Sequence, residues 1–273
     1  MRQFTYIFRA EFCKFKGEFK KYYLDSFGDI IAYVVLFCGI FFTVFKDYEW
    51  SNEAFFQLIM GLFVWYIAIG AIANFTFILQ EEMELGTLEQ IYLTRSPIMK
   101  ILIGRALGSF TFDFLSGLIL SICTGFAISI FTKNYSFSVL NLNISWISLF
   151  LTMVLTMVGI YGFAFILAGI SLVYKRISAI VGVLNNIFLF FTGITIASTF
   201  PPILEGISKV LPITWGILNL KAIILNGYSL QDLVTKPLFL FLCLNSFLYL
   251  VVGITTFKYL EAYCRRKGTL GHY

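Results

Sequence analysis

The residue types best suited to a specific task lie in residues 81–97, which read EEMELGTLEQIYLTRSP. This segment opens with acidic residues, and Gly86-Thr87 then interrupts the helical pattern. Apolar side chains recur after the break at helical spacing, at Leu88, Ile91 and Tyr92. Pro97 ends the short helix that this spacing predicts. Such a helix, with apolar and charged groups, is suited to docking a partner protein, and a solvated acidic loop is the alternative.

Catalytic chemistry finds little support in the remaining residue types. Adjacent glutamates such as Glu81 and Glu82 occur in intramembrane prenyl-protein proteases, but those sites also need an arginine at a fixed offset and histidines. Here position 86 is glycine and the only histidine is His272. A phosphate-binding loop ends in Gly-Lys, and no glycine in this sequence is followed by lysine. We therefore predict no catalytic residue, no bound cofactor and, since the five cysteines form no CxxC pair, no metal site.

Four polar residues within apolar runs are candidates for a translocation path or for helix packing. Asp113 falls about two turns into an apolar run, where an ionised carboxylate is costly unless it is paired or hydrated. The other three are asparagines, at Asn74, Asn185 and Asn186. Each either lines a polar path or forms a hydrogen bond between helices, and the sequence leaves both alternatives open.

The composition predicts that this chain lies in a membrane. Of its 273 residues, 59% are hydrophobic and only 13% are charged, and the mean hydropathy is +0.86. A soluble domain carries roughly 25% charged residues, so this chain has too little polar surface for a water-soluble globule. The net charge of +5 is not gathered into a long basic run, so we expect no nucleic-acid partner.

The apolar runs predict an all-α integral membrane protein with six transmembrane helices, each near or above the roughly 20 residues that cross a bilayer. They cover residues 30–45, 54–79, 106–131, 145–174, 177–199 and 238–257. Before them, residues 1–27 carry an aromatic stripe with basic residues on the far side, which predicts an amphipathic helix lying in the membrane interface. Residues 28–273 then form one transmembrane domain.

Residues 201–225 are apolar, but we do not count them as a seventh span. They contain Pro201, Pro202 and Pro212 together with three charged residues, and the longest uncharged stretch, residues 210–220, is too short to cross. Pro212 removes a backbone donor and breaks a helix. We expect two short re-entrant half-helices in the outer leaflet, within residues 201–236, before the last span.

Charge counting gives the six spans an orientation. With both termini in the cytoplasm, fifteen of the 20 Lys and Arg residues face the inside. This bias agrees with the positive-inside rule. A seventh span would place Arg265, Arg266 and Lys267 outside.

Two motifs carry a resemblance to a known family. From Glu82 the chain reads E-x-E-x-G-T-L-E-Q-x-x-x-T, followed by S-P and I-L-I-G-R. Residues 211–215 match an L-P-x-T-aromatic pattern in the outer segment. With the amphipathic first helix, the six spans and the turn at residues 175–178, these motifs resemble the permeases of type-2 ATP-binding-cassette (ABC) exporters over nearly the whole chain.

The resemblance implies partners and site residues. An ABC ATPase subunit, in two copies, would bind ATP and Mg²⁺, and a second permease chain, identical or homologous, would complete the path. Residues 80–100 would form the cytoplasmic coupling segment, and the outer half-helices would cap the path at Pro201, Pro202, Pro212 and Trp215. The family commonly has proline directly after the coupling threonine, whereas Arg95-Ser96 intervenes here. The ATPase-docking residues would be Glu82, Glu84, Gly86, Thr87, Leu88, Glu89, Ile91, Tyr92 and Arg95.

The cargo is predicted only in broad terms. The 32 phenylalanines and mostly apolar spans favour a hydrophobic or amphipathic compound, such as a drug, an antimicrobial peptide or a lipid-like molecule. A lipid-linked polysaccharide is the alternative within the same family. An ion-coupled secondary transporter would need more intramembrane ionisable residues than Asp113. We expect the plasma membrane of a bacterium as the location.

Overall fold

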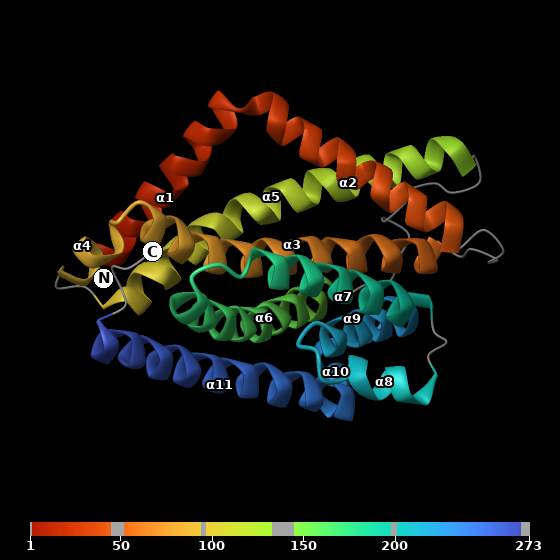
Figure 1. Cartoon of the computed structure of the whole chain (residues 1–273). Coiled ribbons are helices and arrows are strands. Elements are labelled where there is room, and N and C mark those ends of the chain that lie inside the picture. The colour runs from red at the N-terminus through yellow and green to blue at the C-terminus, as the bar shows by residue number, and fades with distance from the viewer. Residues whose placement is uncertain (1, 45–51, 94–96, 133–144, 198–200, 269–273) are drawn as a thin grey trace.

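The computed structural model describes residues 2–44, 52–93, 97–132, 145–197 and 201–268, and within these ranges every regular element is a helix. The long helices form a bundle with the short ones at its two ends (Figure 1). In chain order the helices are α1 (Arg2–Lys21), α2 (Tyr23–Val44), α3 (Asn52–Glu84), α4 (Leu88–Leu93), α5 (Ile98–Thr132), α6 (Trp146–Tyr174), α7 (Ser178–Ala197), α8 (Pro202–Ser208), α9 (Thr214–Asn226), α10 (Leu230–Thr235) and α11 (Pro237–Lys267).

Five of the described helices are long and apolar enough to cross a membrane: α2, α3, α5, α6 and α11. The sixth predicted span coincides with α7, an apolar helix of 20 residues whose described side chains form a shorter apolar stretch, Ser178–Thr192. The predicted all-helical membrane architecture is therefore confirmed. The sixth crossing stays a prediction.

The helices extend beyond the apolar runs that predict them. α3 continues past residue 79 to Glu84, and α5 already begins at Ile98. The added turns contain acidic and basic residues, which suit a helix but not hydrocarbon. Hydropathy marks the part of a helix that fits in lipid, whereas the helix itself ends where Gly86 turns the chain.

The ends of the chain lie at one end of the bundle. The start of α1, the end of α11 and α4 lie together, and α8, α9 and α10 lie towards the other end (Figure 1). An even number of crossings requires this arrangement. Which end faces the cytoplasm stays a prediction, based on the distribution of Lys and Arg.

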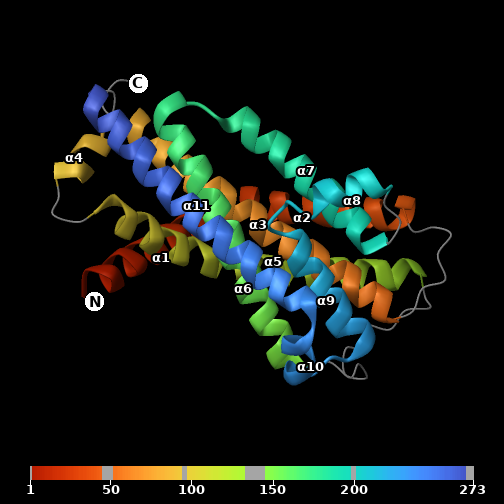
Figure 2. The same ribbon diagram turned by 90° about the horizontal axis from the view of Figure 1, so that it is seen from below.

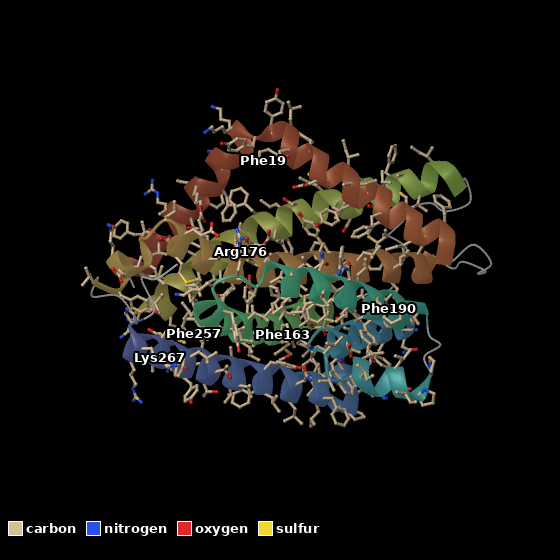
Figure 3. The ribbon with its side chains drawn as sticks, viewed as in Figure 1. Phe19, Phe163, Arg176, Phe190, Phe257 and Lys267 are labelled. Carbon is tan, nitrogen blue, oxygen red and sulfur yellow. The ribbon has the colours of Figure 1, made fainter. Side chains whose placement is uncertain are left out.

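α3 and α6 form the centre of the bundle. α3 packs against α5, α6, α7 and α9, and its side chains Trp65 and Phe75 are fully buried. α6 packs along α11, as the view from below shows (Figure 2). Phe163 and Phe257 lie in the layer between α6 and α11 (Figure 3), where the ring of Phe257 is 5.8 Å from that of Phe165.

Two glycines allow α6 and α11 to touch backbone to backbone. A Cβ atom at Gly253 on α11 would lie 1.9 Å from the carbonyl oxygen of Gly162 on α6, which no side chain tolerates. Close approach at small residues is the usual way in which helices gain packing energy in lipid, where no hydrophobic force draws them together.

The outer segment contains three short helices, so the prediction of two was incomplete. Pro212 lies between α8 and α9, as expected from its missing backbone donor. The missed helix is α10, which begins with a capping box between Ser229 and Asp232. Ile217, Leu220 and Ile223 of α9 are buried, so much of this segment packs against the bundle. Its depth in a membrane stays a prediction.

Candidate functional site

The predicted docking helix is present as α4, joined to α3 by a tight turn. Gly86 adopts φ +68°, the left-handed region that side chains other than glycine's rarely adopt. The backbone N–H of Thr87 donates to the carbonyl oxygen of Glu82 at 3.0 Å, and the Thr87 hydroxyl donates to the Glu82 carboxylate. Leu88 then anchors α4 because its side chain is buried.

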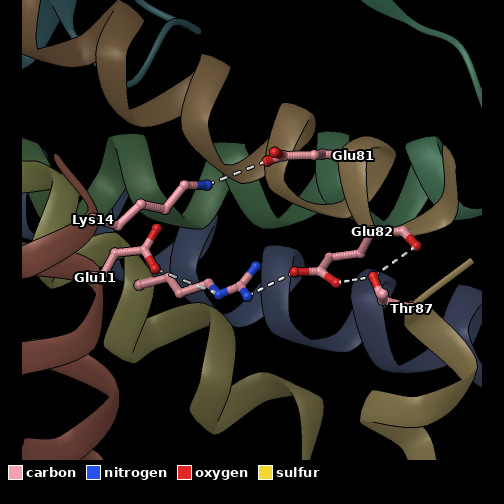
Figure 4. A network of polar contacts seen from close by, with 6 residues as sticks. Glu11, Lys14, Glu81, Glu82 and Thr87 are labelled. Carbon is pink, nitrogen blue, oxygen red and sulfur yellow. Dashed lines mark hydrogen bonds and ion pairs between the residues drawn. The ribbon is translucent and has the colours of Figure 1, made fainter. Parts of the chain in front are cut away.

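The Glu82 carboxylate also binds Arg105 of α5, with Nη2 and Oε1 2.7 Å apart. Arg105 Nε lies 3.7 Å from Oε2 of Glu11 on α1. The charged residues therefore form one network that joins α1, α3, α5 and the turn before α4 (Figure 4). A second ion pair, between Lys14 and Glu81 at 3.4 Å, joins α1 and α3 beside it.

α1 reaches this network because its aromatic face packs on α5. Phe12 and Phe15 contact the ring of Phe112, with centroids 4.9 and 5.5 Å apart. One turn before Phe112 on α5, Gly108 lies against Glu11, and a Cβ atom at this glycine would lie 2.8 Å from Glu11 Cβ. Part of the predicted aromatic stripe therefore contacts protein. Whether the rest of α1 lies in the membrane interface stays a prediction.

The far side of α4 contacts the end of α11. The Arg265 guanidinium lies 4.5 Å from the centre of the Tyr92 ring, a cation–π contact, and Arg265 also pairs with Glu261 at 2.9 Å. Burial, with the nearby negative charge of Glu261, raises the pKa of the Tyr92 phenol above its ordinary value. Tyr92 therefore stays neutral, and α4 is held on two sides by contacts that involve four helices.

The structure divides the predicted docking residues into two groups. Glu82, Thr87, Leu88 and Tyr92 make the contacts that hold α4. In the second group, Glu84, Gly86 and Glu89 are exposed and Ile91 is half-buried. Arg95 lies outside the described residues.

Only two of the four polar residues predicted for a path or for helix packing are in contact, Asn74 and Asp113. Asn74 Nδ2 donates to Asp113 Oδ2 at 3.0 Å, and this hydrogen bond joins α3 to α5. Asn185 lies on a different helix, α7, and its backbone oxygen accepts a hydrogen bond from Trp65 Nε1 at 3.5 Å. Asn186, the next residue of α7, is exposed. The Asn74–Asp113 hydrogen bond joins two helices, as the packing alternative expects. Whether either residue also lines a path stays a prediction.

The predicted outer cap residues lie at the other end of the bundle. Pro201 and Pro202 begin α8, and Pro212 is buried before α9. Trp215 stacks on Phe241 of α11 with ring centres 4.9 Å apart, and its indole N–H donates to the Lys209 carbonyl at 2.8 Å. These contacts hold the short helices onto α11.

Sequence reasoning missed Glu11, the role of Arg105 and the contact of Arg265 with Tyr92. For Glu11 a signal was present: it follows Phe8 by three residues and precedes Phe15 by four, so it lies on the aromatic face of α1. An acidic residue there needs a basic partner. Among the described residues, no group of three or more His, Cys, Asp or Glu side chains could hold a metal ion.

Comparison with known proteins agrees with this architecture. The profile of the family described as ABC-2 type transporter matches residues 2–225, which include α1, the turn at Gly86, α4 and the outer segment up to α9. No curated protein matches the sequence. The matched part of the chain is the membrane component of an ABC transporter, a type of protein that works with an ATPase partner. Because this match covers most of the sequence, the chain belongs to the ABC-2 type transporter family.

Proposed function

We propose that this chain is the permease of an ABC exporter and that α4 docks into a groove of a separate ATPase subunit. The observation that carries the proposal is the attachment of α4. The turn before α4 is hydrogen-bonded to the Glu82 carboxylate, which pairs with Arg105. The Tyr92 ring of α4 contacts the Arg265 guanidinium. When a partner protein displaces a helix that is held in this way, the bundle moves with the helix.

The proposed mechanism is mechanical. Two ATPase subunits bind ATP and Mg²⁺ and close, and their closure displaces α4 in each of two permease chains, identical or homologous. The displaced α4 tilts α3 directly and α5 through Arg105, which opens a path between the two chains towards the outside. ATP hydrolysis lies on the partner, because this sequence contains no phosphate-binding loop.

The proposed cargo is a hydrophobic or amphipathic compound, exported across a bacterial plasma membrane. The apolar spans support it, and the described polar residues Asn74 and Asp113 bind each other rather than gather into a polar path. A lipid-linked polysaccharide is the alternative cargo. An ion-coupled mechanism has less support, because Asp113 is an intramembrane carboxylate already bound by Asn74.

Docking is tested by co-purification with an ABC ATPase subunit produced in the same cells. Glu89 is an exposed acidic residue of α4, so Glu89→Arg reverses a charge at the surface without touching the network. We expect this variant, and a deletion of residues 86–96, to lose ATPase binding and ATPase stimulation. Glu205→Arg, an exposed acidic residue of α8 at the other end, is the matched control. Binding that survives the deletion would contradict docking at α4.

Export is tested in inside-out vesicles that contain the permease–ATPase complex. We expect ATP-dependent accumulation of a fluorescent amphiphilic dye. Accumulation of a lipid-linked oligosaccharide in place of the dye would favour the alternative cargo, and uptake driven by an ion gradient without ATP would overturn the exporter.

A further inference from the structure

A cleft runs between α5 and α6 on the side of the bundle. Both helices pack against α3, but they make few contacts with each other. The space between them is a cavity of about 650 Å³ with α3 as its floor. Ligand pockets in proteins have volumes of roughly 300–1,000 Å³, so the cleft is large enough for a ligand.

The lining is almost entirely apolar. It consists of aliphatic and aromatic side chains, Met thioethers, one aliphatic hydroxyl at Ser121, and Trp146 and Tyr161 at its ends, with no charged residue. Such a surface offers no partner for the polar groups of water, a sugar or a peptide backbone. It suits a hydrocarbon chain.

The cleft opens sideways, away from the bundle. Its floor residues Ile59, Phe63 and Ile67 are at most 3% exposed. Its rim residues are exposed on both walls, for example Ile122 of α5 at 59% and Phe150 of α6 at 66%. α5 and α6 are both membrane-spanning by length and composition, so a bilayer around the bundle would reach this opening.

The cleft is closed at the end nearer α4. There the Tyr161 hydroxyl of α6 donates to the carbonyl oxygen of Ala106 on α5 at 3.4 Å. Phe110 lies beside this contact, with its ring 6.4 Å from that of Tyr161. The other end, at Trp146, lies at the start of α6, where the indole ring is exposed.

The cleft is elongated. The floor extends from Phe56 to Ile67, about 17 Å along α3 at 1.5 Å per residue. A cavity of about 650 Å³ over this length holds a thin flexible chain laid along α3. A second protein helix, about 10 Å in diameter, is the alternative occupant.

We propose that this cleft binds one acyl chain of a bilayer phospholipid, which enters between α5 and α6 and lies along α3 with its end towards Tyr161. An empty cleft would leave the side chains of its walls without dispersion partners, and lipid chains are present at very high concentration at its opening. The bound chain fills the gap and keeps α5 and α6 apart. This site is independent of the export proposal, since it requires only a bilayer.

The test uses a phosphatidylethanolamine with a photoreactive diazirine at the end of one acyl chain. The full-length chain is placed in nanodiscs of the unlabelled lipid with a small share of the probe, irradiated, and the adducts are located by mass spectrometry. We expect adducts on the buried floor, at residues 59–67. Labelling confined to exposed side chains, with the floor unlabelled, would overturn the proposal.

Variants give a second readout. Val154→Trp and Leu118→Trp place a large side chain in the cleft from either wall, and both positions are partly exposed, so the fold has room for them. We expect at least a fivefold loss of floor adducts in both. Leu248→Trp, on the exposed face of α11, is the matched control and leaves them unchanged. Equal labelling in all three variants would contradict the site.

A further arm tests a second copy of this chain as the occupant. A photoreactive benzophenone side chain at position 150, on the rim of the cleft, is irradiated in the same nanodiscs. We expect crosslinks to lipid. Crosslinks to another copy of the chain would overturn the lipid assignment.

Discussion

Arg105 at the start of α5 lies 2.7 Å from the carboxylate of Glu82 at the end of α3. The same guanidinium lies 3.7 Å from Glu11 on α1. One cation therefore pairs with two carboxylates from two other helices, and one of these carboxylates accepts the Thr87 hydrogen bond that fixes the turn before α4.

Arg105→Gln leaves Glu82 and Glu11 without their common cation. Breaking a fully buried pair costs roughly 3–5 kcal/mol, and Arg105 is partly exposed, so we expect about 2 kcal/mol, measured as a lower unfolding temperature in detergent. We also expect stimulation of the partner ATPase to fall, because α5 no longer moves with α4. This fall is larger than the loss of folded protein alone would cause. Arg176→Gln, an exposed cation near the same end, is the control. Unchanged ATPase stimulation in a folded Arg105→Gln variant would show that coupling does not need this network.

Gly86→Ala tests the backbone of the turn alone, since a Cβ at this position meets no atom within 4 Å. A φ of +68° costs a residue with a side chain roughly 1–2 kcal/mol, whereas asparagine adopts this region more readily. We expect Gly86→Ala to reduce ATPase stimulation and Gly86→Asn to keep most of it. The reverse order would show that the turn is not left-handed in the working complex.

Tyr92→Leu removes the ring beneath the Arg265 guanidinium, whereas Tyr92→Phe keeps it. A cation–π contact contributes about 0.5–2 kcal/mol. We expect the leucine variant to unfold at a lower temperature and to stimulate the ATPase less, and the phenylalanine variant to match the parent. A loss of equal size in both variants would mean that the phenol hydroxyl, not the ring, is the important group.

Gly253→Ala forces α6 and α11 apart, because the new methyl group would overlap the Gly162 carbonyl oxygen. Overpacking of this kind costs about 1–3 kcal/mol, which fluorescence-detected size-exclusion chromatography after heating would register. Gly39→Ala, in α2 with no atom within 4 Å of the added Cβ, is the matched control and stays close to the parent. An equally stable Gly253 variant would contradict the close crossing.

Asp113→Asn distinguishes packing from a path. The variant keeps an oxygen that accepts from Asn74, so we expect its transport to stay within about twofold of the parent's. Asp113→Leu loses the hydrogen bond and about 1 kcal/mol of stability, a usual value between membrane helices. A well-folded Asp113→Asn protein without transport would instead place the carboxylate in the path.

The sequence predicted well what depends on the solvent and on local backbone chemistry. Long apolar runs identify membrane helices because lipid leaves the backbone few other choices. Gly86 lies between α3 and α4, and Pro97 lies directly before α5, both for reasons of local backbone chemistry. Pro212 separates α8 from α9 for the same kind of reason. α10 was missed because its capping box is only four residues long and its helix only six.

Contacts between distant segments were beyond sequence reasoning. Arg105 lies about two turns before Asp113 on the same helix. In the structure Arg105 contacts Glu82 and Glu11, whereas Asp113 contacts Asn74. Which carboxylate a cation meets depends on how α1 and α3 pack on α5. The cleft between α5 and α6 likewise exists because these two helices make few contacts with each other, and no sequence motif indicates where two helices do not pack together.

The uninterrupted length of α3 has a mechanical consequence. Its 33 residues form a rod of about 50 Å, which begins at the end of the bundle away from α4 and ends at the turn before α4. A rod of this length that pivots by about 10° at one end sweeps its other end through roughly 9 Å. A rotation of this size imposed at Glu84 would therefore displace Asn52 by nearly the width of a helix.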